Sequence, residues 1–236
     1  MPNLDGVLFD YGGTLVTFPQ YPKECILGVL REFMPRMEAR LGARPPRPEA
    51  ILRDILLPLE AYVSSTSLDE VDYEDVYRNA WRRAGIGLPQ LMLHQILDRE
   101  QMCWDSTVAL DPDAEQALVS LHERGIKRGI CSNAPFPPAM MRRQLQRNRV
   151  VGLVDAVVFS SEIGRRKPAP ELYRAALHEI GTAPERTLFV GDRVREDYDG
   201  PVALGMRAVI VTAHAEEPPP DGVPTIRTLA ELESVL

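Results

Sequence analysis

Residues 6–15 read GVLFDYGGTL, a short apolar run that ends at Asp10 and passes into a pair of glycines. A run of this kind is typical of a strand that is buried on both faces of a parallel sheet. Glycines that follow such a strand let backbone N–H groups approach a ligand closely. Taken alone, Asp10 fits an ordinary Asx turn as well as a functional carboxylate. The rest of the chain decides between these two interpretations.

Further strand signals lie in the second half of the chain. Apolar runs occupy residues 127–131, 155–159, 187–190 and 208–211. Helical patterns long enough to form crossover connections separate the later runs. The alternation from about Asp111 onward predicts an α/β fold with a doubly wound, Rossmann-like parallel sheet. Ligands of such folds bind at the carboxyl ends of the strands, where we expect the functional residues to lie.

The segment between the first strand and this α/β region has a different character. It has no clear strand run, and residues 26–41 and 69–84 space their apolar side chains as amphipathic helices do. A proline-rich patch at residues 44–48 separates these two stretches. We therefore predict a core domain of residues 1–16 and 110–236, with an all-helical domain of residues 17–109 inserted into it.

Composition and charge exclude several classes of protein. The chain has 236 residues, of which 44% are hydrophobic, so it can bury a sizeable core. Its formal net charge of -7 argues against broad binding to nucleic acid or to an acidic membrane surface. No apolar run approaches the roughly 18 residues of a membrane span, and the first residues do not resemble a signal peptide. Oligomeric state is left open.

The cysteine pattern points to the same kind of protein. Three cysteines, Cys25, Cys103 and Cys131, are far apart and form no CxxC pair. This spacing indicates neither a disulfide framework nor a thiolate zinc site. Together with the absence of secretion and membrane signals, it predicts a protein of the reducing cytoplasm.

Polar motifs follow three of the other predicted strands, those of residues 127–131, 155–159 and 187–190, either directly or after a turn. They are Ser132-Asn133, Lys167-Pro168, and the carboxylate pair Asp192 and Asp197. Each motif alone has an ordinary structural explanation: a strand-ending turn, a solvated lysine, or acidic residues at the start of a helix.

In this order, the motifs resemble those of the haloacid dehalogenase-like superfamily, whose members use an aspartate nucleophile. Asp10 with Thr14 resembles the first motif of that superfamily, and the three later motifs follow in sequence. The helical insertion after the first motif is similar to a C1-type cap. The resemblance covers the α/β core at both ends of the chain and implies a hydrolase, most simply a phosphatase.

The resemblance implies a metal site made of oxygen atoms. The ligands would be Asp10, Asp192 and the carbonyl oxygen of Gly12, with Asp197 bound directly or through water. The residue chemistry agrees, because carboxylates that converge at one sheet edge repel one another unless a cation lies among them. Oxygen ligands without histidine or thiolate favour Mg²⁺.

The resemblance also implies roles around the phosphoryl group. Asp10 would attack phosphorus to form an aspartyl-phosphate, with Lys167 and Ser132 as further catalytic residues. The residues expected to bind the substrate are Ser132, Asn133, Lys167, Gly13 and Thr14. The expected activity is Mg²⁺-dependent hydrolysis of a small phosphorylated metabolite.

One position departs from the superfamily pattern. Phosphatases of this type usually carry a second aspartate two residues after the nucleophile, where it acts as general acid and base, but here that residue is Gly12. The cap could supply the acid instead, the substrate could have a good leaving group, or turnover could be weak. The candidate acids in the cap are Asp69, Glu70, Asp72, Glu74, Asp75 and His94.

Two alternatives to a phosphatase stay open at this stage. A dehalogenase keeps the nucleophilic aspartate and needs no second one, but carbon–halogen displacement would not require the metal-binding pattern of Asp192 and Asp197. A catalytically weakened scaffold would bind a phosphorylated ligand or protein without turning it over.

Overall fold

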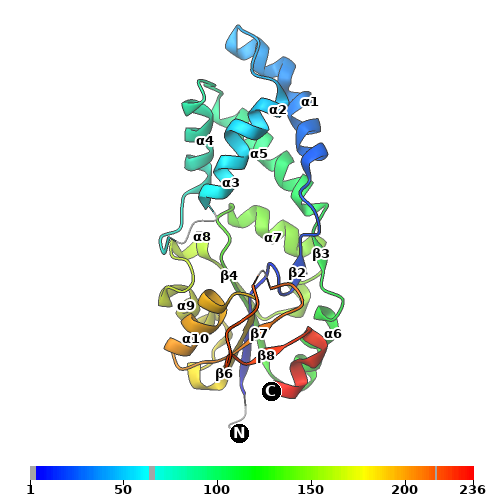
Figure 1. Cartoon of the computed structure of the whole chain (residues 1–236), viewed down its shortest axis with the longest axis vertical. Helices are drawn as coiled ribbons and strands as arrows, with labels where there is room; N and C mark the ends of the chain where they lie inside the picture. The colour runs from blue at the N-terminus through cyan, green and yellow to red at the C-terminus, as the bar shows by residue number, and fades with distance from the viewer. Residues whose placement is uncertain (1–3, 64–66, 216) are drawn as a thin grey trace.

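The computed structural model describes residues 4–63, 67–215 and 217–236. Six strands form one parallel sheet in the order β5-β4-β1-β6-β7-β8 (Figure 1). The strands are β1 Gly6–Phe9, β4 Lys127–Ser132, β5 Ala156–Phe159, β6 Thr187–Gly191, β7 Arg207–Val211 and β8 Thr225–Ile226. The predicted parallel α/β sheet is confirmed. Short β8 was not predicted, because its two residues are too few to form a recognisable apolar run.

Successive residues of the central strand enter two different cores. Val7 and Phe9 pack into one hydrophobic cluster, whereas Leu8 packs into another on the opposite face of the sheet. Helices α6 Ala114–Glu123 and α7 Pro138–Arg147, with the 3₁₀ segments η2 Val151–Leu153 and η5 Leu229–Val235, cover the first face. Helix α9 Pro170–Ile180 covers the second. Both faces are buried, which explains why the strands read as continuous apolar runs.

Short segments complete the connections between these strands. They are α8 Ser160–Ile163, the 3₁₀ turn η3 Pro184–Arg186, the π-helical η4 Val194–Asp199 and α10 Gly200–Ala203.

A helical unit of residues 23–105 lies beyond one end of the sheet (Figure 1). Its elements are α1 Lys23–Leu41, α2 Pro48–Ile51, the π-helical η1 Leu52–Leu56, α3 Leu57–Val63, α4 Tyr73–Arg83 and α5 Gln90–Asp105. Nearly all of the buried side chains in its hydrophobic cluster come from these helices and the turns between them. The two connections to the sheet pair with each other as antiparallel β2 Val16–Thr17 and β3 Ala109–Leu110.

The second predicted helix begins later than its apolar spacing indicated. Helix α4 starts at Tyr73, because the Asp72 side chain accepts a hydrogen bond of 3.0 Å from the Asp75 N–H and caps the helix. Asp69 and Glu70 therefore lie in the preceding loop. In contrast, Pro35 does not interrupt α1.

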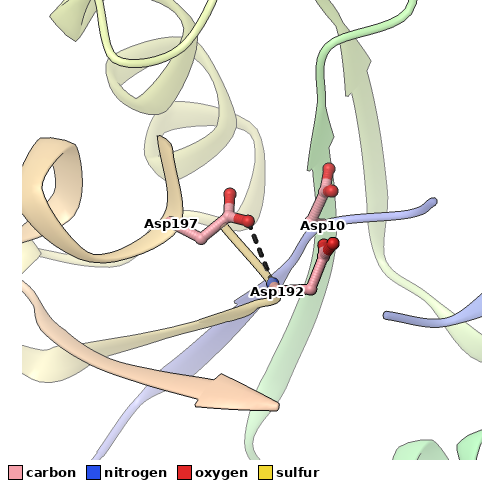
Figure 2. A group of neighbouring side chains, drawn as sticks. All are labelled: Asp10, Asp192 and Asp197. Atoms are coloured by element: carbon pink, nitrogen blue, oxygen red, sulfur yellow. Dashed lines mark hydrogen bonds between the residues drawn. The ribbon is translucent and has the colours of Figure 1, made fainter. Parts of the chain in front are cut away.

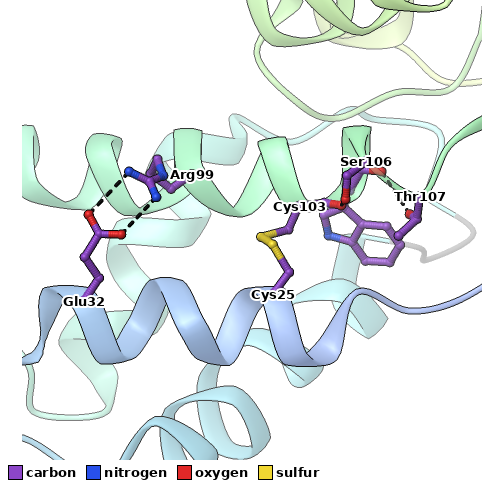
Figure 3. Close-up of a disulfide and its surroundings, with 7 residues drawn as sticks. Cys25, Glu32, Arg99, Cys103, Ser106 and Thr107 are labelled. Carbon is purple, nitrogen blue, oxygen red and sulfur yellow. Dashed lines mark hydrogen bonds and ion pairs between the residues drawn. A yellow bond between two sulfur atoms is a disulfide. The ribbon is translucent and has the colours of Figure 1, made fainter.

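A disulfide between Cys25 and Cys103 corrects the expectation drawn from cysteine spacing. It joins α1 to α5, and an ion pair between Glu32 and Arg99 joins the same two helices farther along (Figure 3). The two cysteines are 78 residues apart in sequence, but their Cα atoms lie 5.7 Å apart. Only the packing of α1 on α5 brings the two thiols together.

The disulfide leads to a prediction about stability. Closing a long loop lowers the entropy of the unfolded chain, and a native disulfide is typically worth about 2–4 kcal/mol. We expect the Cys25→Ser, Cys103→Ser double variant to unfold at lower temperature than the oxidised wild type. Reductant should lower the melting temperature of the wild type but leave that of the variant unchanged. Equal melting temperatures in all four samples would contradict a disulfide in solution.

Buried Glu100 leads to a second prediction. It accepts a hydrogen bond of 3.1 Å from the Tyr77 hydroxyl, and burial raises its pKa to about 8. Because this folded-state pKa lies above the unfolded value, the stability that protonated Glu100 provides is complete below about pH 4.5 and is lost as pH rises to about 8.

The neutral Glu100→Gln variant should escape this loss. We expect its melting temperature to exceed that of the wild type at pH 8, by about 2–4 °C for each kcal/mol recovered, with a smaller difference at pH 5. Glu38→Gln, on an exposed part of α1, is the control. Parallel pH profiles for wild type and Glu100→Gln would show that Glu100 does not titrate in this way.

Candidate active site

Three neighbouring strands deliver polar residues to one edge of the sheet. Asp10 follows β1, Ser132 ends β4, and Asp192 follows β6. Since β4 and β6 both pair with β1 in parallel, their carboxyl ends meet at this edge. The sheet order therefore brings Ser132 and Asp192 close to Asp10, although each is more than one hundred positions from Asp10 in the sequence.

Asp10, Asp192 and Asp197 form a buried carboxylate cluster (Figure 2). One oxygen from each residue lies within 4.8 Å of the others. Asp197 is held by its Oδ2, which accepts hydrogen bonds from the backbone N–H groups of Asp192 at 3.1 Å and Arg193 at 2.9 Å. Gly191 makes room for it, because a Cβ at that position would lie 2.3 Å from the Asp197 carboxyl carbon.

Burial and mutual repulsion disfavour the charged forms of this cluster. Burial raises the pKa of Asp192 to about 8, and the negative charge of Asp10 adds to the effect. Burial raises the pKa of Asp197 to about 6, although nearby Lys167 opposes the increase. A divalent cation among the three carboxylates would relieve the repulsion. The all-oxygen donor set fits Mg²⁺.

Lys167 is the cation that the structure places in this cluster. Its Nζ lies 2.8 Å from Asp10 Oδ1 and 2.6 Å from Asp197 Oδ1. Burial by itself favours the neutral amine, but the charges of Asp10 and Asp197 outweigh it and hold the pKa of Lys167 above its usual range. Lys167 is therefore a buried, charged group and not a solvated surface lysine.

Asn133 positions the backbone on either side of that lysine. Its Oδ1 accepts a hydrogen bond of 2.7 Å from the Lys167 N–H, and its Nδ2 donates one of 3.2 Å to the Lys167 carbonyl oxygen. The side-chain amide is thus already used, while Asn133 still lines the cavity described below. Ser132 lines the same cavity and is almost completely buried.

Thr14 holds Asp192, and Gly13 leaves room for it. The Thr14 hydroxyl donates a hydrogen bond of 3.2 Å to Asp192 Oδ1. Gly13 has a positive φ of 79°, and a Cβ there would lie 2.5 Å from Asp192 Oδ2. The Gly13 N–H donates to the Val16 carbonyl oxygen at 2.8 Å. The glycine is required at this position because both its backbone conformation and the closeness of the carboxylate exclude a side chain.

A cavity of about 750 Å³ extends from the carboxylate cluster to the helical unit. Its wall includes the residues that the sequence singled out: Asp10, Gly12, Gly13, Ser132, Asn133, Lys167, Asp192 and Asp197. Thr14 lies behind this wall, fully buried. The helical unit contributes Glu60, Val63, Gln101 and Trp104. This volume is sufficient for a small metabolite.

The candidate acids named from the sequence of the cap do not line this cavity. Asp69 pairs with Arg165, and Glu70 is buried against Arg166 and Ser160. Asp72 caps α4 with Asp75 as donor, and Glu74 lies 3.2 Å from His94. Sequence reasoning missed Glu60, because it reads as an ordinary polar position between the apolar residues of a helix.

Comparison with known proteins identifies the family of this chain. The family model described as haloacid dehalogenase-like hydrolase matches residues 4–205. A phosphoserine phosphatase from Thermus thermophilus is 30% identical over 215 residues, covering 87% of this chain and 84% of that protein. A glyceraldehyde 3-phosphate phosphatase from Methanothermobacter thermautotrophicus is 31% identical over 112 residues, 48% of this chain and 49% of that protein.

Solved structures show the same fold. A HAD phosphatase from Thermococcus onnurineus superimposes with a TM-score of 0.65 at 20% identity, over 98% of this chain and 97% of that one. A 2-haloacid dehalogenase from Pseudomonas syringae gives a TM-score of 0.69 at 18% identity, over the same shares of the two chains. Because the family match spans residues 4–205 and the phosphatase relative covers most of the chain, the chain belongs to the haloacid dehalogenase-like hydrolases and is an enzyme of that family.

Proposed function

We propose that this protein is a Mg²⁺-dependent phosphatase that hydrolyses a small phosphorylated metabolite through an aspartyl-phosphate on Asp10. The observation that carries the proposal is the Lys167 ammonium, held between Asp10 and Asp197 at the floor of a cavity of metabolite size. The phosphatase relatives support the reaction type. These relatives are named for different phosphorylated compounds, so the proposal extends to the reaction type and to the class of substrate.

The metal would be held by Asp10, by Asp192 and by the carbonyl oxygen of Gly12. Asp197 would hold it directly or through water. Bound there, Mg²⁺ supplies positive charge that offsets the carboxylates and the incoming phosphoryl group. The three carboxylates fit this role because burial and mutual repulsion disfavour their charged forms, as the raised pKa values of Asp192 and Asp197 indicate. A cation among them would offset this cost. Thr14 contributes by holding Asp192 through a hydrogen bond, and Gly13 leaves the space that this carboxylate occupies.

The chain's own residues then carry out the reaction. An Asp10 oxygen attacks phosphorus, and the bond between phosphorus and the leaving oxygen breaks. Lys167 and the Ser132 hydroxyl balance the charge on the phosphoryl oxygens, with Asn133 keeping Lys167 in place. Water next attacks phosphorus, which releases inorganic phosphate and restores the Asp10 carboxylate.

Residues 17–109 form the cap in this proposal, and residues 1–16 and 110–236 form the core. The β2–β3 pair lies at the two crossings between them. Glu60, Gln101 and Trp104 bring the cap's side chains to the cavity that contains Asp10. A cap in this place would exclude water from the reaction and select the leaving group.

The proposed compartment is the cytoplasm, where phosphorylated metabolites are found. No helix in the described part of the chain has both the length and the apolar character needed to cross a bilayer. The Cys25–Cys103 disulfide is unusual for a reducing compartment. Fractionation of the producing cells tests this placement, and activity in the cytosolic fraction would support it.

The nucleophile is tested by Asp10→Asn. We expect phosphate release to fall by at least about 1000-fold, the order of loss seen when a nucleophile is removed. Asp5→Asn is the matched control: Asp5 precedes the same strand at the opposite sheet edge, where it pairs with Arg186 on the surface. The assay is phosphate release from a panel of sugar phosphates, phosphoamino acids, nucleotides and acyl phosphates. Normal activity of Asp10→Asn would refute the proposal.

Metal dependence is tested separately by chelation. We expect EDTA to abolish phosphate release and added Mg²⁺ to restore it, because the carboxylates otherwise repel the substrate. Mg²⁺ should also raise the melting temperature of the wild type, but much less that of Asp192→Asn. Halide release from a haloacid that persists in EDTA, without phosphate release under any condition, would instead favour a dehalogenase.

A further inference from the structure

In this mechanism an alkoxide leaving group needs a proton donor, and Gly12 does not provide one. The space next to Gly12 is also occupied: a Cβ there would lie 3.2 Å from Cε2 of Phe18. The Phe18 ring packs edge-on against Trp104, with ring centroids 6.3 Å apart, and both residues line the cavity. A side chain at residue 12 would therefore begin in tight contact with the Phe18 ring.

Few carboxyl groups line the cavity in the described part of the chain. They are Asp10, Glu60, Asp192, Glu196 and Asp197. Asp10, Asp192 and Asp197 form the proposed metal and nucleophile cluster. Glu196 belongs to the core and pairs with Arg195. Glu60 is therefore the carboxyl group that the helical unit contributes to the cavity, into which the leaving group of a substrate bound at Asp10 would extend.

Two other polar side chains in the cavity wall, His214 and Arg166, already interact with groups of the protein. His214 Nε2 lies 3.3 Å from Asp111 Oδ2. The Arg166 guanidinium donates to the Val63 carbonyl oxygen at 2.8 Å and pairs with Glu70 at 3.1 Å.

The surroundings of Glu60 suit a group that gives up and takes back a proton. The Tyr21 hydroxyl donates a hydrogen bond of 3.1 Å to Glu60 Oε1, and Tyr21 itself packs edge-on against Trp104. Within the described residues, no basic side chain lies in ion-pair distance of the Glu60 carboxyl. Burial raises the pKa of Glu60, and the Tyr21 hydrogen bond opposes this. The neighbouring ionisable groups are Tyr73 and Glu100, and the negative charge of Glu60 helps to raise the pKa of each.

We infer that Glu60 is the general acid and base of this enzyme, an assignment that rests on the proposed phosphatase function. In the first step an Asp10 oxygen bonds to phosphorus, the bond to the leaving oxygen breaks, and that oxygen takes the Glu60 proton to leave as an alcohol. In the second step the Glu60 carboxylate takes a proton from water as the water oxygen bonds to phosphorus. Phosphate departs, Asp10 is restored and Glu60 is protonated again.

The test compares leaving groups in the Glu60→Gln variant, which keeps the shape of the side chain but cannot exchange a proton. In single turnovers, release of glycerol from glycerol phosphate should slow by about 100- to 10,000-fold, the usual contribution of a general acid. Release of 4-nitrophenol from its phosphate should change by less than about 10-fold, because this leaving group departs without a proton. Phosphoenzyme should then accumulate, since the second step lacks its base.

Two further variants complete the experiment. Glu74→Gln, another glutamate of the helical unit but outside the cavity, is the control and should match wild type with both substrates. Adding Gly12→Asp together with Phe18→Ala to Glu60→Gln should restore glycerol release, because it opens the space beside residue 12 and places a carboxyl there.

The outcomes separate this inference from the proposed function. Unchanged turnover of both substrates in Glu60→Gln, or equal slowing of both first steps, would overturn the role of Glu60. In either case, loss of activity in Asp10→Asn would still support the phosphatase. Rapid release of 4-nitrophenol by Glu60→Gln also shows that the variant is folded, so a slow reaction with glycerol phosphate reports on the missing proton.

Discussion

The site depends on the two ion pairs that the Lys167 ammonium makes with Asp10 and Asp197. Three buried carboxylates within 4.8 Å of one another would be strongly unfavourable without compensating positive charge. Lys167 supplies one charge, and the proposed Mg²⁺ supplies the rest. Asn133 holds the lysine backbone, and Thr14 holds Asp192 in the space that Gly13 leaves. These neighbours fix the cluster in place before any substrate arrives, which is the form of preorganisation that phosphoryl transfer requires.

The helical unit completes what the core lacks. Trp104 of this unit packs against Phe18 and Tyr21, which precede α1; the Phe18 ring lies beside Gly12, and the Tyr21 hydroxyl donates a hydrogen bond to Glu60. The Cys25–Cys103 disulfide joins α1 and α5 one residue before Trp104, which lines the cavity. In the proposed enzyme, the core therefore supplies the nucleophile that attacks phosphorus, and the cap supplies the acid that protonates the leaving oxygen.

Sequence patterns predicted most of the core because buried parallel strands leave a strong local signal. The runs before Asp10 and Asp192 are continuous and apolar, since both faces of the sheet are covered. Their polar ends then identify the functional edge. Two interpretations of the helical unit failed for a common reason. The disulfide joins residues 78 positions apart, and the suggested cap acids turned out to serve surface pairs, a helix cap and a buried pair with Arg166. Neither outcome has a signal within a short window of sequence.

By itself, the sequence determined the parallel α/β core, the order of its motifs and the kinds of atoms gathered at the strand ends, because each follows from local apolar runs and the residues that end them. Only the tertiary structure decided that Lys167 is buried between two carboxylates, that Phe18 occupies the space beside Gly12, and that Glu60 faces the cavity. These facts depend on how distant segments pack against one another. Helical periodicity tells which side of a helix is apolar, but it does not tell which polar residue at its margin meets a site built by other strands.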